Sequence, residues 1–107
     1  MKFHFKESSE WTLENELLCL LIFKELEERS FPHGLQMELA KKLSSQTSLD
    51  ASNISAKVSN FKSEAGINSE SNSSEATKVL YQRYGSLTLN EVKALYEGYK
   101  LALEQNA

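Results

Sequence analysis

The hydrophobic and polar positions of this chain repeat with the spacing of amphipathic helices. From Thr12 to about Arg29 a wide apolar stripe predicts a long helix at the centre of the domain. Leu35, Leu39 and Leu43 stand four residues apart and predict a second, shorter helix that ends in the polar run 44–48. Two later seams predict helices over about 73–84 and after Thr88, and their inward-facing residues are Ala76, Val79, Leu80, Tyr84, Val92, Leu95, Tyr96, Tyr99 and Leu103.

The stretch 50–63 predicts a third helix with two different faces. Ile54, Val58 and Phe61 recur at i, i+4 and i+7 and form its apolar side. The opposite side carries short polar or small side chains and one cation, with no acid to repel a phosphate: Asn53, Ala56, Lys57 and Asn60. This surface is typical of a helix that enters a DNA groove.

Turn and capping residues set the limits of these helices. Pro32 lacks a backbone donor and Gly34 accepts a positive φ, so 30–34 reads as a turn. Gly85 suits the C-terminal cap of the fourth helix. The N-terminal caps that we expect are Ser48 or Asp50 for the third helix, Asn72 with Glu75 for the fourth and Thr88 with Glu91 for the last.

Composition favours an all-α fold. The chain has 107 residues, which fits a single domain over 1–107, and its one proline and four glycines are too few turn formers for an all-β protein. We expect four to five helices. The predicted organisation is an N-terminal arm at 1–10, a helix-turn-helix-like three-helix core at 11–64 and a C-terminal helical pair at 72–105.

The formal net charge of −3 argues against a protein that coats nucleic acid nonspecifically, because that mode needs a large cationic excess. Specific binding through one local face remains open, since the charge is unevenly distributed. The stretch 10–29 carries six acids against one lysine and one arginine, whereas 51–63 carries Lys57 and Lys62 and no acid.

The sequence lacks the patterns of catalysis and metal binding. His4 and His33 belong to no spacing that would place two imidazoles on one metal, and no glycine-rich phosphate loop is present. Cys19 is the only cysteine and lies in an apolar run, which predicts a buried, inert thiol in a reducing cytoplasmic setting. The longest uninterrupted apolar run, 17–23, is too short for a membrane span. We predict no enzyme activity, no cofactor and no metal site.

Three segments together carry a family resemblance. They are Trp11-Thr12 with Glu14 and the leucine-rich helix, Leu39-Ala40-Lys41-Lys42-Leu43, and Ile54-Ser55-Ala56-Lys57-Val58-Ser59-Asn60-Phe61. In these segments the chain resembles the small helical domain found ahead of HNH endonuclease domains in bacteria, and more loosely the three-helix Myb/SANT class. The resemblance covers roughly residues 11–99. It implies a DNA-recognition or targeting module that contacts nucleic acid through its third helix, where Lys57 and Asn60 are the matching polar positions.

Two departures from the family pattern qualify what the resemblance implies. The nuclease domain is missing, so on this pattern we expect binding without cleavage. The turn 44–49 also lacks the arginine that related modules often carry.

Two hypotheses of function follow. In the leading one the third helix binds double-stranded DNA, and a homodimer is compatible with it because one helix-turn-helix buries little DNA surface alone. The residues that would contact DNA are Ser52, Asn53, Ser55, Ala56, Lys57, Ser59, Asn60 and Lys62. In the alternative, the acidic face of the first helix and the tyrosine seam contact another protein, either as an interaction module or as a small acidic regulator of a DNA-binding protein.

Overall fold

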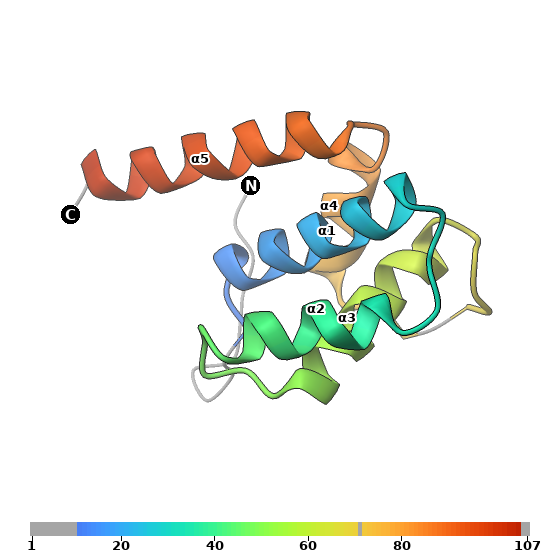
Figure 1. Ribbon diagram of the computed structural model, residues 1–107. Coiled ribbons are helices and arrows are strands. Elements are labelled where there is room, and N and C mark those ends of the chain that lie inside the picture. The colour runs from blue at the N-terminus through green and yellow to red at the C-terminus, as the bar shows by residue number, and fades with distance from the viewer. Residues whose placement is uncertain (1–10, 71, 106–107) are drawn as a thin grey trace.

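The predicted all-α fold is confirmed. The computed structural model describes residues 11–70 and 72–105, and within these ranges it consists of five helices and no strand (Figure 1). Their bounds are α1 Leu13–Glu28, α2 Leu35–Ser44, α3 Ala51–Glu64, α4 Glu75–Tyr84 and α5 Leu89–Gln105. The N-terminal arm expected at 1–10 lies outside the described residues. None of the described helices has the length and apolar character that a bilayer span requires.

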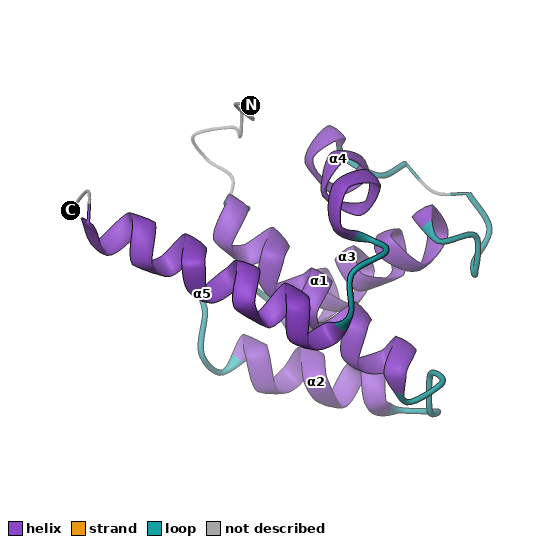
Figure 2. Cartoon of the chain, turned by 90° about the horizontal axis from the view of Figure 1, so that it is seen from above, coloured by secondary structure: helices purple, strands orange, loops and turns teal. Residues whose placement is uncertain are grey.

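Helix α1 is the element on which the other four are assembled. It packs against α2, α3, α4 and α5, and Figure 2 shows it in the middle, with α2 on one side and α4 on the other. Its wide apolar stripe supplies a large part of the core, as the sequence predicted: Leu17, Cys19, Leu20, Ile22, Phe23 and Leu26 are all buried. Helix α5 packs on α1 alone among the main helix contacts, and its C-terminal end extends beyond the other helices (Figure 1).

An aromatic cluster joins three elements to α1. The ring of Phe23, which is fully buried, lies 6.1 Å from Phe31, 6.3 Å from Phe61 and 6.0 Å from Tyr81 between ring centroids. These partners come from the turn after α1, from α3 and from α4. Offset and edge-on ring pairs at such distances add to the free energy gained by burying their apolar area. The cluster therefore links α1 to the turn that follows it, to α3 and to α4.

The caps of three helices follow the sequence prediction. Asp50 caps α3 by accepting a hydrogen bond from the Ser52 backbone N–H at 3.1 Å. Thr88 and Glu91 form the reciprocal capping box at the start of α5, with distances of 2.9 and 3.2 Å. Gly85 is the C-terminal cap of α4 with a right-handed φ of −63°. Glycine fits this position because a Cβ here would clash with the Tyr81 backbone oxygen and ring.

The capping pair expected at Asn72 and Glu75 was wrong. Helix α4 begins two residues later than predicted, and its N-cap is Ser74, whose hydroxyl accepts from the Thr77 backbone N–H at 3.2 Å. The reason is a tertiary contact, because the same hydroxyl also donates to the buried Glu16 carboxylate at 3.5 Å. Local sequence patterns do not reveal a cap whose hydroxyl also donates to a distant carboxylate.

The capping box makes the start of α5 sensitive to acid. Hydrogen bonds from the Thr88 backbone and then from its side chain lower the pKa of Glu91 below its ordinary value. The ionised carboxylate therefore stabilises the cap fully above the pKa of an unfolded glutamate, and this contribution is lost as pH falls through the lowered value. We expect the side-chain carbon of Glu91, followed by NMR, to titrate at lower pH in the folded chain than in an unfolded peptide of the same sequence. Thr88→Ala removes only the side-chain hydrogen bond and keeps the backbone donor, so it should reduce the difference without abolishing it. Identical titration in the intact chain and the peptide would contradict this account.

Candidate functional site

A buried ion pair joins α1 to α3 in the interior of the protein. The Lys57 Nζ atom lies 2.7 Å from the Glu16 Oε1 atom, and these residues are 8% and 0% exposed. A buried ion pair is stable only when both charged groups also form hydrogen bonds with their remaining donors and acceptors. The residues around the pair supply these hydrogen bonds.

Polar groups from α4 and a ring before α1 complete the pair. The Thr77 hydroxyl donates to Glu16 at 3.0 Å and accepts from Lys57 Nζ at 3.2 Å. Ser74 reaches the same carboxylate, so Glu16 lies against the first turn of α4, where the helix dipole favours a negative charge. On the other side, Lys57 Nζ lies 4.6 Å from the centroid of the Trp11 ring, a cation–π contact. No buried side-chain nitrogen or oxygen in the described ranges lacks a hydrogen-bond partner.

This arrangement corrects the prediction that Lys57 faces a DNA groove. Its position on α3 is three residues after Ile54 and four before Phe61, so it follows the apolar side of the helix and points inward with it. The sequence carried a signal for this, because Glu16 stands beside the apolar run of α1 and is the acid that matches a cation on the packing side of α3. Buried Glu16, Lys24 and Thr77 were all missed by the sequence interpretation.

Three other predicted DNA contacts lie where α3 meets α2. The side-chain amide of Gln36 donates to the Ser55 hydroxyl at 3.0 Å and to the Ser59 hydroxyl at 2.9 Å. Lys62 Nζ donates to the side-chain Oε1 atom of Gln36 at 3.3 Å and lies 5.5 Å from the centroid of the Phe31 ring. All three side chains are partly buried, so they serve first to hold α2 on α3.

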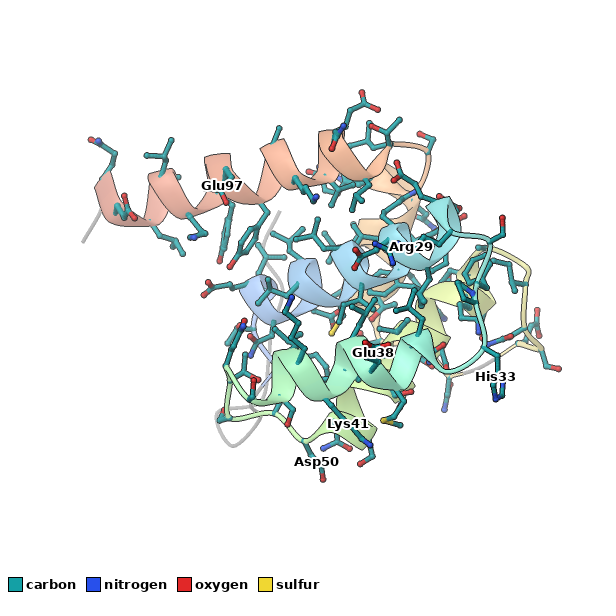
Figure 3. The ribbon with its side chains drawn as sticks, in the orientation of Figure 1. Arg29, His33, Glu38, Lys41, Asp50 and Glu97 are labelled. Carbon is teal, nitrogen blue, oxygen red and sulfur yellow. The ribbon has the colours of Figure 1, made fainter. Side chains whose placement is uncertain are left out.

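The remaining predicted contacts reach solvent. Ser52, Asn53 and Ala56 are exposed on the first turns of α3, and Asn60 is half-buried. The surface around them carries both signs of charge, because Lys41 of α2 and the capping Asp50 lie along the same lower edge of the molecule in Figure 3. Of the eight residues predicted to contact DNA, the structure places neither lysine on an open surface.

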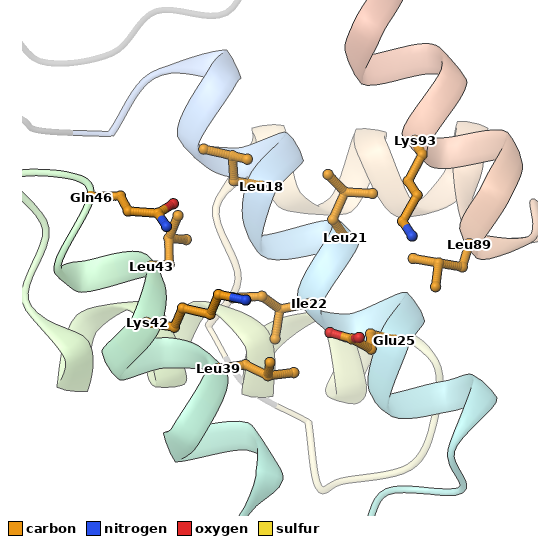
Figure 4. A pocket seen from close by; sticks show the side chains of 10 residues that line it. All are labelled: Leu18, Leu21, Ile22, Glu25, Leu39, Lys42, Leu43, Gln46, Leu89 and Lys93. Atoms are coloured by element: carbon orange, nitrogen blue, oxygen red, sulfur yellow. The ribbon is translucent and has the colours of Figure 1, made fainter.

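An apolar groove lies between α1, α2 and α5 (Figure 4). It encloses about 200 Å³. Six of its lining side chains are aliphatic and come from all three helices: Leu18, Leu21, Ile22, Leu39, Leu43 and Leu89. Lys42, Lys93, Glu25 and Gln46 supply its polar edge. We call this feature the α1/α2/α5 groove.

The charges at the edge of the α1/α2/α5 groove are unequally neutralised. Glu25 is paired with Arg29 at 3.6 Å, one turn along the same helix. Lys42 and Lys93 are exposed on opposite walls, and within 11–70 and 72–105 neither forms an ion pair. Figure 4 shows them extending from α2 and α5 on either side of the leucines of α1. The opening therefore presents two free cations.

A second apolar hollow of about 210 Å³ lies on the other side of α1, between α4 and α5. Its lining residues are Leu13, Leu17, Val79, Leu80, Arg83, Tyr84, Leu95 and Tyr99. Arg83 is its only charged residue, so this hollow offers less to orient a ligand than the α1/α2/α5 groove does.

The Cys19 thiol is buried and lines neither hollow. Burial, together with the nearby Glu16 carboxylate and against the lowering effect of Lys57, raises the pKa of Cys19 to about 12. The thiol is therefore protonated at neutral pH. In the part of the chain that the structure describes, no group of histidine, cysteine, aspartate or glutamate side chains could hold a metal ion.

Comparisons with known proteins add no relative: no family model, no curated protein and no solved structure matches the chain.

We expect the ion pair to dominate the stability of this region. Lys57→Met leaves Glu16 as an uncompensated buried charge and should lower the free energy of unfolding by about 3–5 kcal/mol in a urea titration. Lys62→Met, which removes the half-buried lysine of the same helix, should cost only about 1 kcal/mol. In the double variant Glu16→Leu, Lys57→Met, both charges are gone, so its stability should exceed that of Lys57→Met. Equal losses in the two lysine variants would contradict the buried pair.

Proposed function

We propose that this chain is a non-catalytic protein-interaction module. The observation that carries the proposal is the burial of Lys57 against Glu16, which removes the central cation from the helix expected to contact DNA. Phosphate contacts by lysine and arginine supply most of the affinity of DNA-binding proteins. With Lys62 held at Gln36, the exposed face of α3 keeps only small uncharged side chains.

The α1/α2/α5 groove supports the same proposal. Its aliphatic floor is partly open to solvent at Leu18, Leu21 and Leu39, and its walls are helices rather than loops. An apolar groove between helices is the surface that recognises an amphipathic helix of another protein. Burial of such a floor in a complex is favourable because apolar area leaves water.

DNA binding is a second candidate, favoured by one observation. Ser52, Asn53 and Ala56 are exposed on the first turns of α3, while α2 packs against that helix. In this candidate Asn53 would pair with an adenine edge, and Lys41 of α2 would contact a phosphate.

Site-specific photocrosslinking in the cells that encode the chain separates the two functions. A benzophenone amino acid in place of Gln46, at the edge of the groove, should give a discrete protein adduct that resists nuclease. The same probe in place of Asn53, on the exposed face of α3, should give no nuclease-sensitive adduct. Gln82, exposed on α4, is the matched control position.

The proposal would be overturned if the probe at residue 46 gave no protein adduct. A nuclease-sensitive adduct at residue 53 in that same chain would establish DNA binding in its place.

A further inference from the structure

We infer that the α1/α2/α5 groove binds an acidic amphipathic helix of a partner protein, whose apolar side chains contact the leucine floor and whose carboxylates pair with Lys42 and Lys93. This inference rests on the proposed function and names its site and the chemistry of its partner.

The length of the groove fits a helix. Leu18 and Glu25 bound its floor along α1, and a neighbouring hollow that shares Leu18, Leu43 and Gln46 continues it to Glu14. Glu14 and Glu25 are eleven positions apart, which is a rise of about 16 Å along α1, or about three helical turns. A helical ligand of this length presents anchors at i, i+4, i+7 and i+11 to one groove.

The width of the groove follows from how its walls are held. Helices α2 and α5 each pack on α1, but they are not packed against each other along their length. The apolar side chains between them are therefore left partly exposed, with Leu18, Leu21 and Leu39 half-buried at its floor. A helix of a partner protein that lies along α1 would cover these three side chains at once.

The unpaired lysines at the opening of the groove determine which charge the partner helix should carry. The chain as a whole is acidic, with a formal net charge of −3, yet the two unpaired charges at the opening of the groove are both lysines. Of the two acids along it, Glu25 is paired with Arg29, and Glu14, in the neighbouring hollow, accepts a hydrogen bond from the Tyr96 hydroxyl at 3.0 Å. Opposite charges across an interface steer association and penalise a wrong partner, so an acidic helix is favoured over a basic one.

A designed peptide tests the inference without knowledge of the natural partner. The probe is a fluorescein-labelled 16-residue helical peptide with leucines at i, i+4, i+7 and i+11, flanked by glutamates, and its control carries lysine in place of every glutamate. Fluorescence anisotropy should show binding of the glutamate peptide that weakens with added salt and exceeds binding of the lysine peptide. Amide shifts in the intact chain should map to α1, α2 and the first turns of α5.

Matched protein variants identify the groove as the site. Lys42→Glu with Lys93→Glu should weaken binding of the glutamate peptide by about tenfold or more. Lys41→Glu with Lys78→Glu makes the same change in net charge at exposed positions outside the groove, and it should leave the affinity nearly unchanged. Leu39→Ala should weaken binding, whereas Met37→Ala, exposed on the same helix, should not. Circular dichroism of each variant confirms that it folds.

Three outcomes overturn the inference: no binding of the glutamate peptide, equal binding of both peptides, or equal effects of the two charge-reversal pairs. A dimer of the chain alone in sedimentation that Lys42→Glu with Lys93→Glu dissolves would also overturn it, because a second copy would then be the occupant. If the peptide fails while the photocrosslinked protein adduct at residue 46 persists, the partner chemistry is wrong and the proposed function stands. If both fail, the proposed function fails as well.

Discussion

The buried Glu16–Lys57 pair is the interaction on which the arrangement of the helices depends. It lies where α1, α3 and the first turn of α4 meet, and each helix contributes a polar group to it. Removing two charges from water costs several kcal/mol per ion, so the pair is tolerated only in the one geometry that supplies its hydrogen bonds. We interpret the pair as the element that selects one register for these three helices among several that apolar packing alone would permit.

The same pair determines which surfaces remain for binding. Because Lys57 is held inside, α3 contributes hydrophobic side chains to the core and an uncharged face to solvent. A similar role is taken at the other end of α1 by Lys24, which is 2% exposed and donates to Glu27 and to the Gly85 carbonyl before α5. With these two buried lysines and the half-buried Lys62 used to join helices, the free cations of the described surface include Lys42 and Lys93, on the walls of an apolar groove.

The sequence predicted those features that depend on local chemistry. The spacing of leucines located α1 and α2, and Asp50 and the Thr88–Glu91 box were correct caps, because helix periodicity and capping involve residues within a few positions of one another. Lys57 was misplaced because a lysine is assumed to face water unless a partner is known, and Glu16 is 41 positions away. The groove was missed for the same reason, since Lys42 and Lys93 line one groove only in the folded chain.

Lysine reactivity distinguishes Lys57, which lies in the interior, from Lys42 and Lys93, which are exposed on the surface. The native chain would be treated briefly with an acetylating reagent, digested, and the modified fraction of each lysine measured by mass spectrometry, with the urea-unfolded chain as reference. We predict that Lys57 reacts far more slowly than Lys42 and Lys93 in the native chain and at a similar rate in urea. Native Lys57 that reacts as fast as Lys42 would contradict the account.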